Sequence, residues 1–202
     1  MPAQLSFDPA RTAVLSMDLQ AGIVSTYVKD PELLTRAASV LQRARASAMR
    51  IIHVQVGFRP NLPEVGTRNP LFAAIKSSSQ HQRLFQGPSG AIHAVVAPQA
   101  DDIVITKHRV SAFAGTDLDM ILRANDIETL VLFGIATSGV VLSTLLQAAD
   151  ADYRLVVIKD CCADLDLELH NCLLDKLFPK RAQVLTAAEF VGHLDSLTPS
   201  RG

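Results

Sequence analysis

The sequence predicts a three-layer α/β/α domain built around a six-stranded parallel sheet. Three observations support this class. Six short segments are rich in valine, isoleucine and leucine, segments with helical periodicity separate most of them, and the two kinds alternate along most of the chain. The apolar segments are nearly continuous rather than alternating with polar residues, which is typical of strands covered by helices on both faces. Alternating strands and helices favour a parallel sheet.

The predicted strands share a short length and a high content of β-branched residues. They are TAVLSM (12–17), RIIHVQV (50–56), DIVITK (102–107), TLVLFG (129–134), RLVVIK (154–159) and AQVLTA (182–187). Together they predict the sheet of a Rossmann-like fold, in which right-handed crossovers join parallel strands.

Helical periodicity occupies the intervals between these strands. The expected helices are 31–49, 116–125, 138–153 and 166–178. Pro31 suits the first turn of its helix, and Thr116 is a good N-cap followed by acidic residues. These helices supply the outer layers of the predicted domain.

The region 57–101 departs from the regular alternation. It is rich in Pro, Gly and Ser, and one short helix is expected at 70–76. Connections of this length often carry function, and this one is expected to cover the ligand site. No repeat or linker divides the chain, so residues 1–202 are expected to form a single domain.

Composition restricts the classes of function. Hydrophobic residues make up 49% of the chain and charged residues 19%, which is a globular composition. The net charge of -1 gives no indication of nucleic-acid binding. The sequence lacks a secretory signal pattern and a long unbroken apolar run, so no membrane association is expected. Three cysteines, an odd number, favour a reducing compartment, and a cytoplasmic location is expected.

Polar residues follow several of the predicted strands. Open parallel sheets bind ligands beyond the carboxyl ends of their strands. Asp18 ends the first strand and Lys107 the third. Taken singly, Asp18 could be a loop or N-cap carboxylate and Lys107 a solvated lysine. Together they could form an Asp–Lys pair for proton transfer, in which the lysine favours the ionised carboxylate and burial favours the protonated one.

The chain resembles the isochorismatase-like hydrolases, also called the cysteine hydrolase family. The resemblance covers nearly the whole chain and rests on LSMDLQ (15–20), ITKHRVSAFAGTDLDMILRANDIETLVLFGIAT (105–137), DYRLVVIKDCCAD (152–164) and FPKRAQVLTAAEF (178–190). It implies a hydrolase in which Asp18 and Lys107 are catalytic.

The family's third catalytic residue is absent. The family turn G-[VI]-[AS]-T-x-x-C-V places a cysteine where this chain has Val140. Valine cannot attack a carbonyl, so covalent hydrolysis would need a replacement. Cys161, Cys162 and Ser138 remain open as substitutes, although a buried thiol or an N-cap is the simpler role for each. The family also often has a non-proline cis peptide in this turn, which is expected here at Ala136–Thr137.

The resemblance implies the residues around the substrate. Thr137, Ser138, Gly139 and Val140 form the turn, whose backbone N–H groups could bind an anion at a helix N-terminus. Phe113 belongs to SAFAGTDLD, a segment that often lines family pockets.

Metal and cofactor requirements follow from the region after the second strand. Some relatives carry an Asp-x-His…His cluster there, whereas this chain reads HVQVGFRPNLPEV from His53. One histidine is too few for a zinc site, which needs three or four protein ligands. We expect no catalytic metal and no cofactor.

Two hypotheses for function follow. In the first, the protein hydrolyses a small anionic substrate by Asp18/Lys107 acid–base chemistry without a covalent cysteine. True isochorismatases lack the cysteine, and their aspartate is thought to protonate the vinyl carbon of a vinyl ether. In the second, the protein is a non-catalytic small-molecule-binding or scaffolding member of the same fold. The family also implies a homodimer or homotetramer.

Overall fold

The fold is that of a computed structural model, which describes residues 8–197. Its centre is a sheet of six strands, all parallel, in the order β3-β2-β1-β4-β5-β6. This confirms the predicted three-layer class and the six-stranded parallel sheet. The predicted single domain comprises residues 1–202. Residues 1–7 and 198–202 of this range lie outside the described residues.

The strands and helices follow the predicted alternation. The strands are β1 (Thr12–Met17), β2 (Arg50–Val56), β3 (Ile103–Lys107), β4 (Thr129–Gly134), β5 (Arg154–Ile158) and β6 (Gln183–Leu185). The helices are α1 (Ala21–Tyr27), α2 (Leu33–Ala46), α3 (Pro70–Ser77), α4 (Ser79–Arg83), α5 (Gly87–Gly90), α6 (Leu118–Ala124), α7 (Leu142–Asp150), α8 (Leu167–Cys172) and α9 (Ala187–Leu197). Short 3-10 or π-helical turns occur at Pro9–Arg11, Ala94–Val96, Thr137–Val141, Lys159–Cys161, Leu173–Leu177 and Phe178–Lys180.

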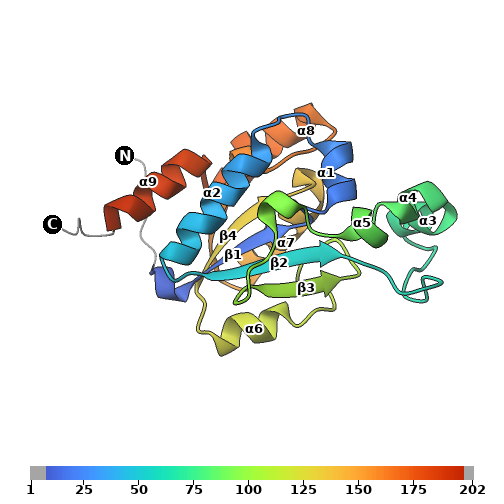
Figure 1. Cartoon of the computed structure of the whole chain (residues 1–202), viewed down its shortest axis with the longest axis horizontal. Helices are drawn as coiled ribbons and strands as arrows, with labels where there is room; N and C mark the ends of the chain where they lie inside the picture. The colour runs from blue at the N-terminus through green and yellow to red at the C-terminus, as the bar shows by residue number, and fades with distance from the viewer. Residues whose placement is uncertain (1–7, 198–202) are drawn as a thin grey trace.

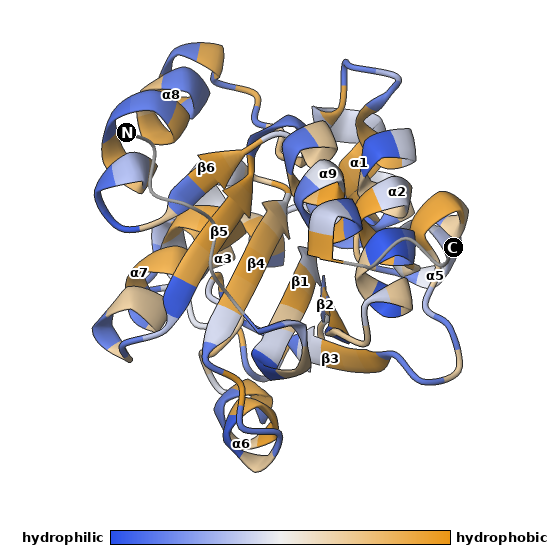
Figure 2. Ribbon diagram, turned by 90° about the vertical axis from the view of Figure 1, so that its left-hand side faces the viewer, coloured by the Kyte–Doolittle hydropathy of each residue, from blue (hydrophilic) through white to orange (hydrophobic). Residues whose placement is uncertain are grey.

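Helices cover both faces of the sheet. Helices α2 and α9 pack against each other on one face, whereas α6 lies on the other (Figure 1). The central strands β1 and β4 are buried along their whole length, and Figure 2 shows their ribbons in hydrophobic colours. Burial of each large aliphatic or aromatic core side chain contributes about 1.5–3 kcal/mol. No helix among the described residues is both long and apolar enough to cross a membrane.

Strand register brings the predicted site residues to one edge. Met17 at the end of β1 pairs with Val54 in β2 and Gly134 in β4. Lys107, the last residue of β3, pairs with Val56. Because all these strands are parallel, Asp18, Lys107 and the turn after β4 emerge at the same carboxyl edge.

The long connection between β2 and β3 contains three short helices, of which the sequence predicted one. Helices α3 and α4 lie together at the end of the molecule to which β2 and β3 point (Figure 1). Leu62, Val65 and Phe72 form a small hydrophobic cluster of their own, separate from the main core. This connection therefore has its own packing above the carboxyl edge of the sheet.

Candidate active site

The structure brings Asp18 and Lys107 together. Lys107 Nζ lies 2.8 Å from Asp18 Oδ2, and the two side chains are only 3% and 7% exposed. Asp18 follows β1 in the left-handed backbone region, with φ of 55°, and its N–H donates to the carbonyl of Val54. Asp is one of the non-glycine residues that tolerate this region. The turn of the chain thus directs the carboxylate toward the end of β3.

The Asp18 carboxyl group has one unused oxygen. Oδ2 contacts Lys107, whereas Oδ1 is buried and has no hydrogen-bond partner within the described residues. Burial raises the pKa of Asp18, and the Lys107 charge and hydrogen bond only partly oppose this. The backbone amide of Val56, whose hydrogen bond goes to Gln20, adds a smaller lowering effect on that pKa. The site therefore holds a carboxyl group that favours its protonated form more than an exposed aspartate does.

Gln20 ties the long connection to this edge, a role that sequence reasoning missed. Its Nε2 donates to the carbonyls of Val56 at 2.9 Å and Gly90 at 2.7 Å, and its Oε1 accepts from the Val56 N–H. Backbone hydrogen bonds from Ala21 to Ala91 and from His93 to Leu19 add to this contact. The sequence feature that indicates this role is the side-chain amide of Gln20, two positions after Asp18 in a segment that is otherwise apolar.

The turn after β4 is a π-helical turn over Thr137–Val141, and Val140 within it is 2% exposed. The non-proline cis peptide is Ile135–Ala136. The expected position, Ala136–Thr137, is therefore wrong by one residue, and the cis bond comes directly before the extended residue that precedes the π-helical turn. The Gly139 N–H donates to Ala136 O at 3.0 Å, so this amide serves the turn itself rather than a free anion site.

Contacts from the segment after β5 hold the same turn. Thr137 N–H donates to Ala163 O at 3.0 Å, and Ser138 N–H donates to Asp164 Oδ2 at 2.8 Å. The Thr137 hydroxyl lies 2.8 Å from His170 Nδ1. Thr137 is fully buried. Thr137 and Ser138 therefore have local structural partners, and their contact with a substrate remains a prediction.

Gly134 allows β1 and β4 to approach closely where the site begins. Its φ is 147°, and a Cβ atom at this position would lie 2.0 Å from Met17 O. A side chain here would push apart the two strands that precede Asp18 and the turn.

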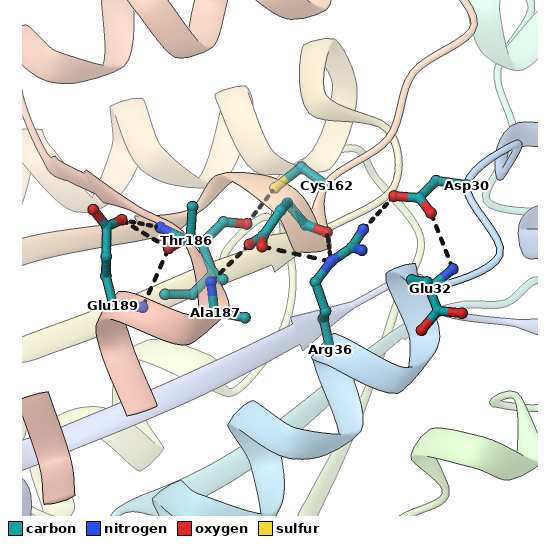
Figure 3. A network of polar contacts seen from close by, with 9 residues as sticks. Asp30, Glu32, Arg36, Cys162, Thr186, Ala187 and Glu189 are labelled. Carbon is teal, nitrogen blue, oxygen red and sulfur yellow. Dashed lines mark hydrogen bonds and ion pairs between the residues drawn. The ribbon is translucent and has the colours of Figure 1, made fainter. Parts of the chain in front are cut away.

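Cys161 and Cys162 are embedded below the surface. Both are buried, and Cys162 Sγ donates to Ile158 O at 3.4 Å, as Figure 3 shows. Burial raises the pKa of the Cys162 thiol to about 12 and also raises that of Cys161. Because the thiolate is the nucleophile, these groups are poorly suited to serve as substitutes for the cysteine expected at position 140.

The polar network around these cysteines joins structural elements. Asp160 accepts from Ala187 N–H at the start of α9 and from Arg36 of α2, and Arg36 also pairs with Asp30 (Figure 3). This network fastens α2 and α9 to the end of β5, which accounts for the polar residues that follow this strand.

Phe113 packs in the core against Tyr153. It is 9% exposed, and its ring lies 6.3 Å from that of Tyr153, which immediately precedes the amino end of β5. Asp18 lies at the opposite, carboxyl edge. Phe113 is therefore part of the hydrophobic core, and its contact with a substrate remains a prediction.

His53 and two arginines that follow β2 and β3, Arg59 and Arg109, have internal partners. His53 Nε2 lies 3.2 Å from Asp102, and the guanidinium of Arg109 donates to two backbone carbonyls. Arg59, 62% exposed, lies 3.8 Å from Glu64. Between residues 8 and 197, no three His, Cys, Asp or Glu side chains are arranged to hold a metal ion.

Comparison with known proteins identifies the family. A family profile described as the isochorismatase domain matches residues 12–189. The chain belongs to the isochorismatase family. It is 30% identical over 194 residues to the isochorismatase family protein YecD of Escherichia coli O157:H7, covering 94% of this chain and 100% of that protein.

Other relatives of the isochorismatase family have named activities or solved structures. A maleamate amidohydrolase of Pseudomonas putida is 28% identical, covering 80% of this chain and 74% of that protein. A ureidoacrylate amidohydrolase of Methylorubrum extorquens is 30% identical, with 79% and 72% covered. The structure of an isochorismatase family protein from Burkholderia thailandensis superposes with a TM-score of 0.81 at 31% identity, covering 94% and 98%. Named family members are thus hydrolases.

Proposed function

We propose that this protein hydrolyses a small anionic substrate by acid–base chemistry of Asp18 and Lys107, without a covalent cysteine intermediate. The observation that carries the proposal is the buried pair in which Asp18 Oδ1 has no partner within the described residues while Oδ2 is held by Lys107. A carboxyl group held through one oxygen can exchange a proton through the other. Its raised pKa favours the protonated form and so suits a general acid.

A vinyl-ether substrate fits these groups without a nucleophilic side chain. Asp18 gives its proton to the terminal vinyl carbon, and the electrons of the C=C bond form the new C–H bond. The positive charge left on the ether-bearing carbon is captured by water, which returns a proton to the Asp18 carboxylate. The resulting hemiketal releases an alcohol and a ketone, so one water is consumed and Asp18 is regenerated.

Lys107 serves two purposes in this proposal. Its ammonium group orients the carboxyl group of Asp18 through the 2.8 Å contact. It also places a positive charge beside the bound substrate, where a substrate carboxylate is stabilised in a site with little solvent screening.

The size and charge of the substrate are suggested by relatives. Maleamate and ureidoacrylate, named for two of them, are small carboxylates with a C=C bond. We propose the same general class for this chain. An amide substrate requires a different chemical step here, because Val140 stands where the resemblance expects the cysteine.

Val140 also motivates a second candidate function, a protein that binds a small anion without converting it. Its buried aliphatic side chain occupies the position at which the resemblance expects the nucleophile. Binding alone requires only the anion-stabilising charge of Lys107 and the shape of the site. The two functions differ in whether product forms.

The test combines a substrate screen with two matched variants. The wild-type protein is incubated with small unsaturated carboxylates, including vinyl ethers and amides, and products are detected by mass spectrometry. Asp18→Asn removes the proton donor with little change in shape, whereas Asp102→Asn changes another buried carboxylate away from the pair. We expect turnover by the wild type and by a folded Asp102→Asn, and none by Asp18→Asn.

Two results would contradict the proposed mechanism. Turnover that survives Asp18→Asn would remove Asp18 from the chemistry. Saturable binding of an anion by calorimetry, with no product from any compound that binds, would favour the binding function.

We also propose a homodimer or homotetramer. Its support is a group of three exposed leucines just before and at the start of α8, Leu165, Leu167 and Leu169, with exposed fractions of 51%, 58% and 41%. Light scattering after size-exclusion chromatography tests this, and the mass of a monomer would contradict it.

A further inference from the structure

Lys107 has a second hydrogen-bond acceptor besides Asp18. Its Nζ donates to the backbone carbonyl of Arg109 at 3.0 Å. An ammonium group on a flexible four-carbon chain needs more than one fixed acceptor to keep a single position. The position of the Arg109 carbonyl therefore helps to decide where the Lys107 charge lies relative to Asp18.

The side chain of Arg109 fixes that part of the backbone. Its Nη1 donates to His108 O at 2.6 Å and its Nη2 donates to Glu64 O at 2.9 Å. Its guanidinium carbon lies 4.9 Å from the centre of the Phe72 ring, in cation–π contact. These contacts use the planar fork of arginine, and lysine cannot reproduce them together.

Glu64 and Phe72 belong to the long connection rather than to the sheet. Phe72 is part of the small cluster with Leu62 and Val65, and Val110, next to Arg109, packs against this cluster. Arg109 therefore spans two parts of the molecule: the segment that follows β3 and the separately packed connection above the sheet edge.

A second set of hydrogen bonds joins the same two parts where the connection leaves β2. Gly57 N–H donates to Lys107 O at 3.1 Å, and His108 Nδ1 lies 2.6 Å from Gly57 O. These bonds fix where the connection begins. Arg109 fixes its later portion, around residues 64–72, so a movement of that portion is transmitted to the Arg109 carbonyl.

We propose that Arg109 is a positioning residue that couples the packing of the connection at residues 64–72 to the position of the Lys107 ammonium group. It contacts neither Asp18 nor the Lys107 ammonium through its own side chain and acts through its backbone carbonyl. Its importance for turnover rests on the proposed function, but the coupling is a property of the protein alone. When a substrate moves the connection, the position of the Lys107 charge responds.

The consequence is measurable at Asp18 without any substrate. Lys107 is the charged group that lowers the pKa of Asp18, against the larger effect of burial. If the Arg109 carbonyl no longer holds Lys107, the average distance between ammonium and carboxylate increases. The pKa of Asp18 should then rise further.

The experiment is a 13C NMR titration of the Asp18 side-chain carboxyl group in the full-length protein labelled at aspartate, with Asp18→Asn assigning the resonance. We compare Arg109→Ala, Arg109→Lys and Arg68→Ala with the wild type. Arg68 is a matched control because it lines the same surface hollow of about 160 Å³ as Arg109 and Phe72. Its removal deletes an equal charge without removing the bonds of Arg109.

We expect Arg109→Ala to raise the pKa of Asp18 by about half a unit or more, and Arg109→Lys to raise it by a smaller amount despite the retained charge. Arg68→Ala should leave it within about 0.2 unit of the wild type, since exposed charges are screened by solvent. If Arg109→Ala does not fold, the pKa of Asp18 in Arg109→Lys is compared with that in the wild type instead.

Three outcomes would overturn the coupling. If Asp18 kept its wild-type pKa in folded Arg109 variants, the Arg109 side chain would not be needed to hold the Arg109 carbonyl in place. An equal shift in Arg68→Ala would reduce the effect to net charge. A change confined to substrate KM, with the Asp18 titration intact, would make Arg109 a substrate-binding group instead. Failure of the proposed hydrolysis would leave the NMR result unaffected.

Discussion

Two buried carboxylates near opposite ends of the sheet have opposite electrostatic properties. Burial acts on both Asp18 and Asp102, but Arg45, the Gln99 N–H and His53 together hold the pKa of Asp102 below its ordinary value. Asp18 has only Lys107 as a charged partner among the described residues, and burial raises its pKa. Asp102 Oδ1 and Oδ2 both accept bonds from Arg45, at 3.1 and 2.5 Å, whereas Asp18 Oδ1 accepts none within the described part of the chain.

The difference separates a structural ion pair from a candidate for chemistry. A carboxylate with all its acceptor positions filled stabilises the fold and has nothing left to offer a ligand. A buried carboxylate with an empty acceptor position is costly for the fold unless a ligand or a proton occupies it. Burial alone therefore does not distinguish these two carboxylates, whereas the unused oxygen of Asp18 does.

The strongest test exchanges the cation at each carboxylate. Lys107→Met should lower turnover by about 10²–10⁴-fold, because it removes the group that orients Asp18. Arg45→Met should leave turnover intact and lower the free energy of unfolding by about 3 kcal/mol, because Asp102 keeps its charge without its main partner. Turnover assays and urea unfolding of both variants measure this. Equal losses of turnover and of stability in both variants would show that Asp18 and Asp102 do not differ in role.

Val140→Cys tests whether a thiol at position 140 can act as a nucleophile. The substitution removes one buried methyl group and should cost about 1 kcal/mol of stability. We expect hydrolysis of maleamate or ureidoacrylate at least about tenfold above the wild-type background, since a thiol adds a covalent route. Val140→Ser is the control for pocket size. Mass spectrometry that finds the introduced thiol acylated would locate the intermediate, and an unmodified thiol with no new amidase activity would contradict the idea.

Acid pH should expose the role of Asp102. Its pKa is lowered in the folded state, so its stabilising contribution is complete above the pKa of the unfolded chain, near 4, and is lost as pH falls through the folded value. Asp102→Asn should cost about 2 kcal/mol at pH 7 and progressively less below about pH 4. Chemical denaturation at a series of pH values gives the difference. A difference independent of pH would mean that the carboxylate charge contributes nothing.

The smallest effect is expected at the two buried cysteines. Cys161→Ala and Cys162→Ala should leave turnover within about twofold of the wild type, since their raised pKa values leave almost no thiolate near pH 7. Each should cost about 1 kcal/mol of stability through lost packing. A loss of turnover in either folded variant would restore a thiol mechanism.

Strand and site positions were predicted from sequence where the signal was local. The strands 12–17, 50–56 and 129–134 were predicted to the residue, because continuous β-branched runs define them. The Asp18–Lys107 contact was predicted because parallel strands end at one edge, so distant residues meet there.

Other features depend on contacts between distant segments. Helix α1 and the role of Gln20 were missed, because α1 is short and the partners of Gln20, Val56 and Gly90, lie far along the chain. The helices predicted at 138–153 and 166–178 each overlap a π-helical turn in the structure, at Thr137–Val141 and Leu173–Leu177. The ring contact of Phe113 with Tyr153 was also not predicted, because the two residues are far apart in the sequence.

The connection between β2 and β3 is attached at its two ends, through Gly57 to the end of β3 and through residues 90–93 to the segment around Gln20. Between these anchors, Arg109 also holds Glu64 and Phe72 to the segment after β3, and the rest of the stretch packs around Leu62, Val65 and Phe72. Mutation and insertion can therefore accumulate where these contacts are kept, while the Asp18–Lys107 pair stays in place. Such a division lets a lineage acquire new substrates without rebuilding its chemistry.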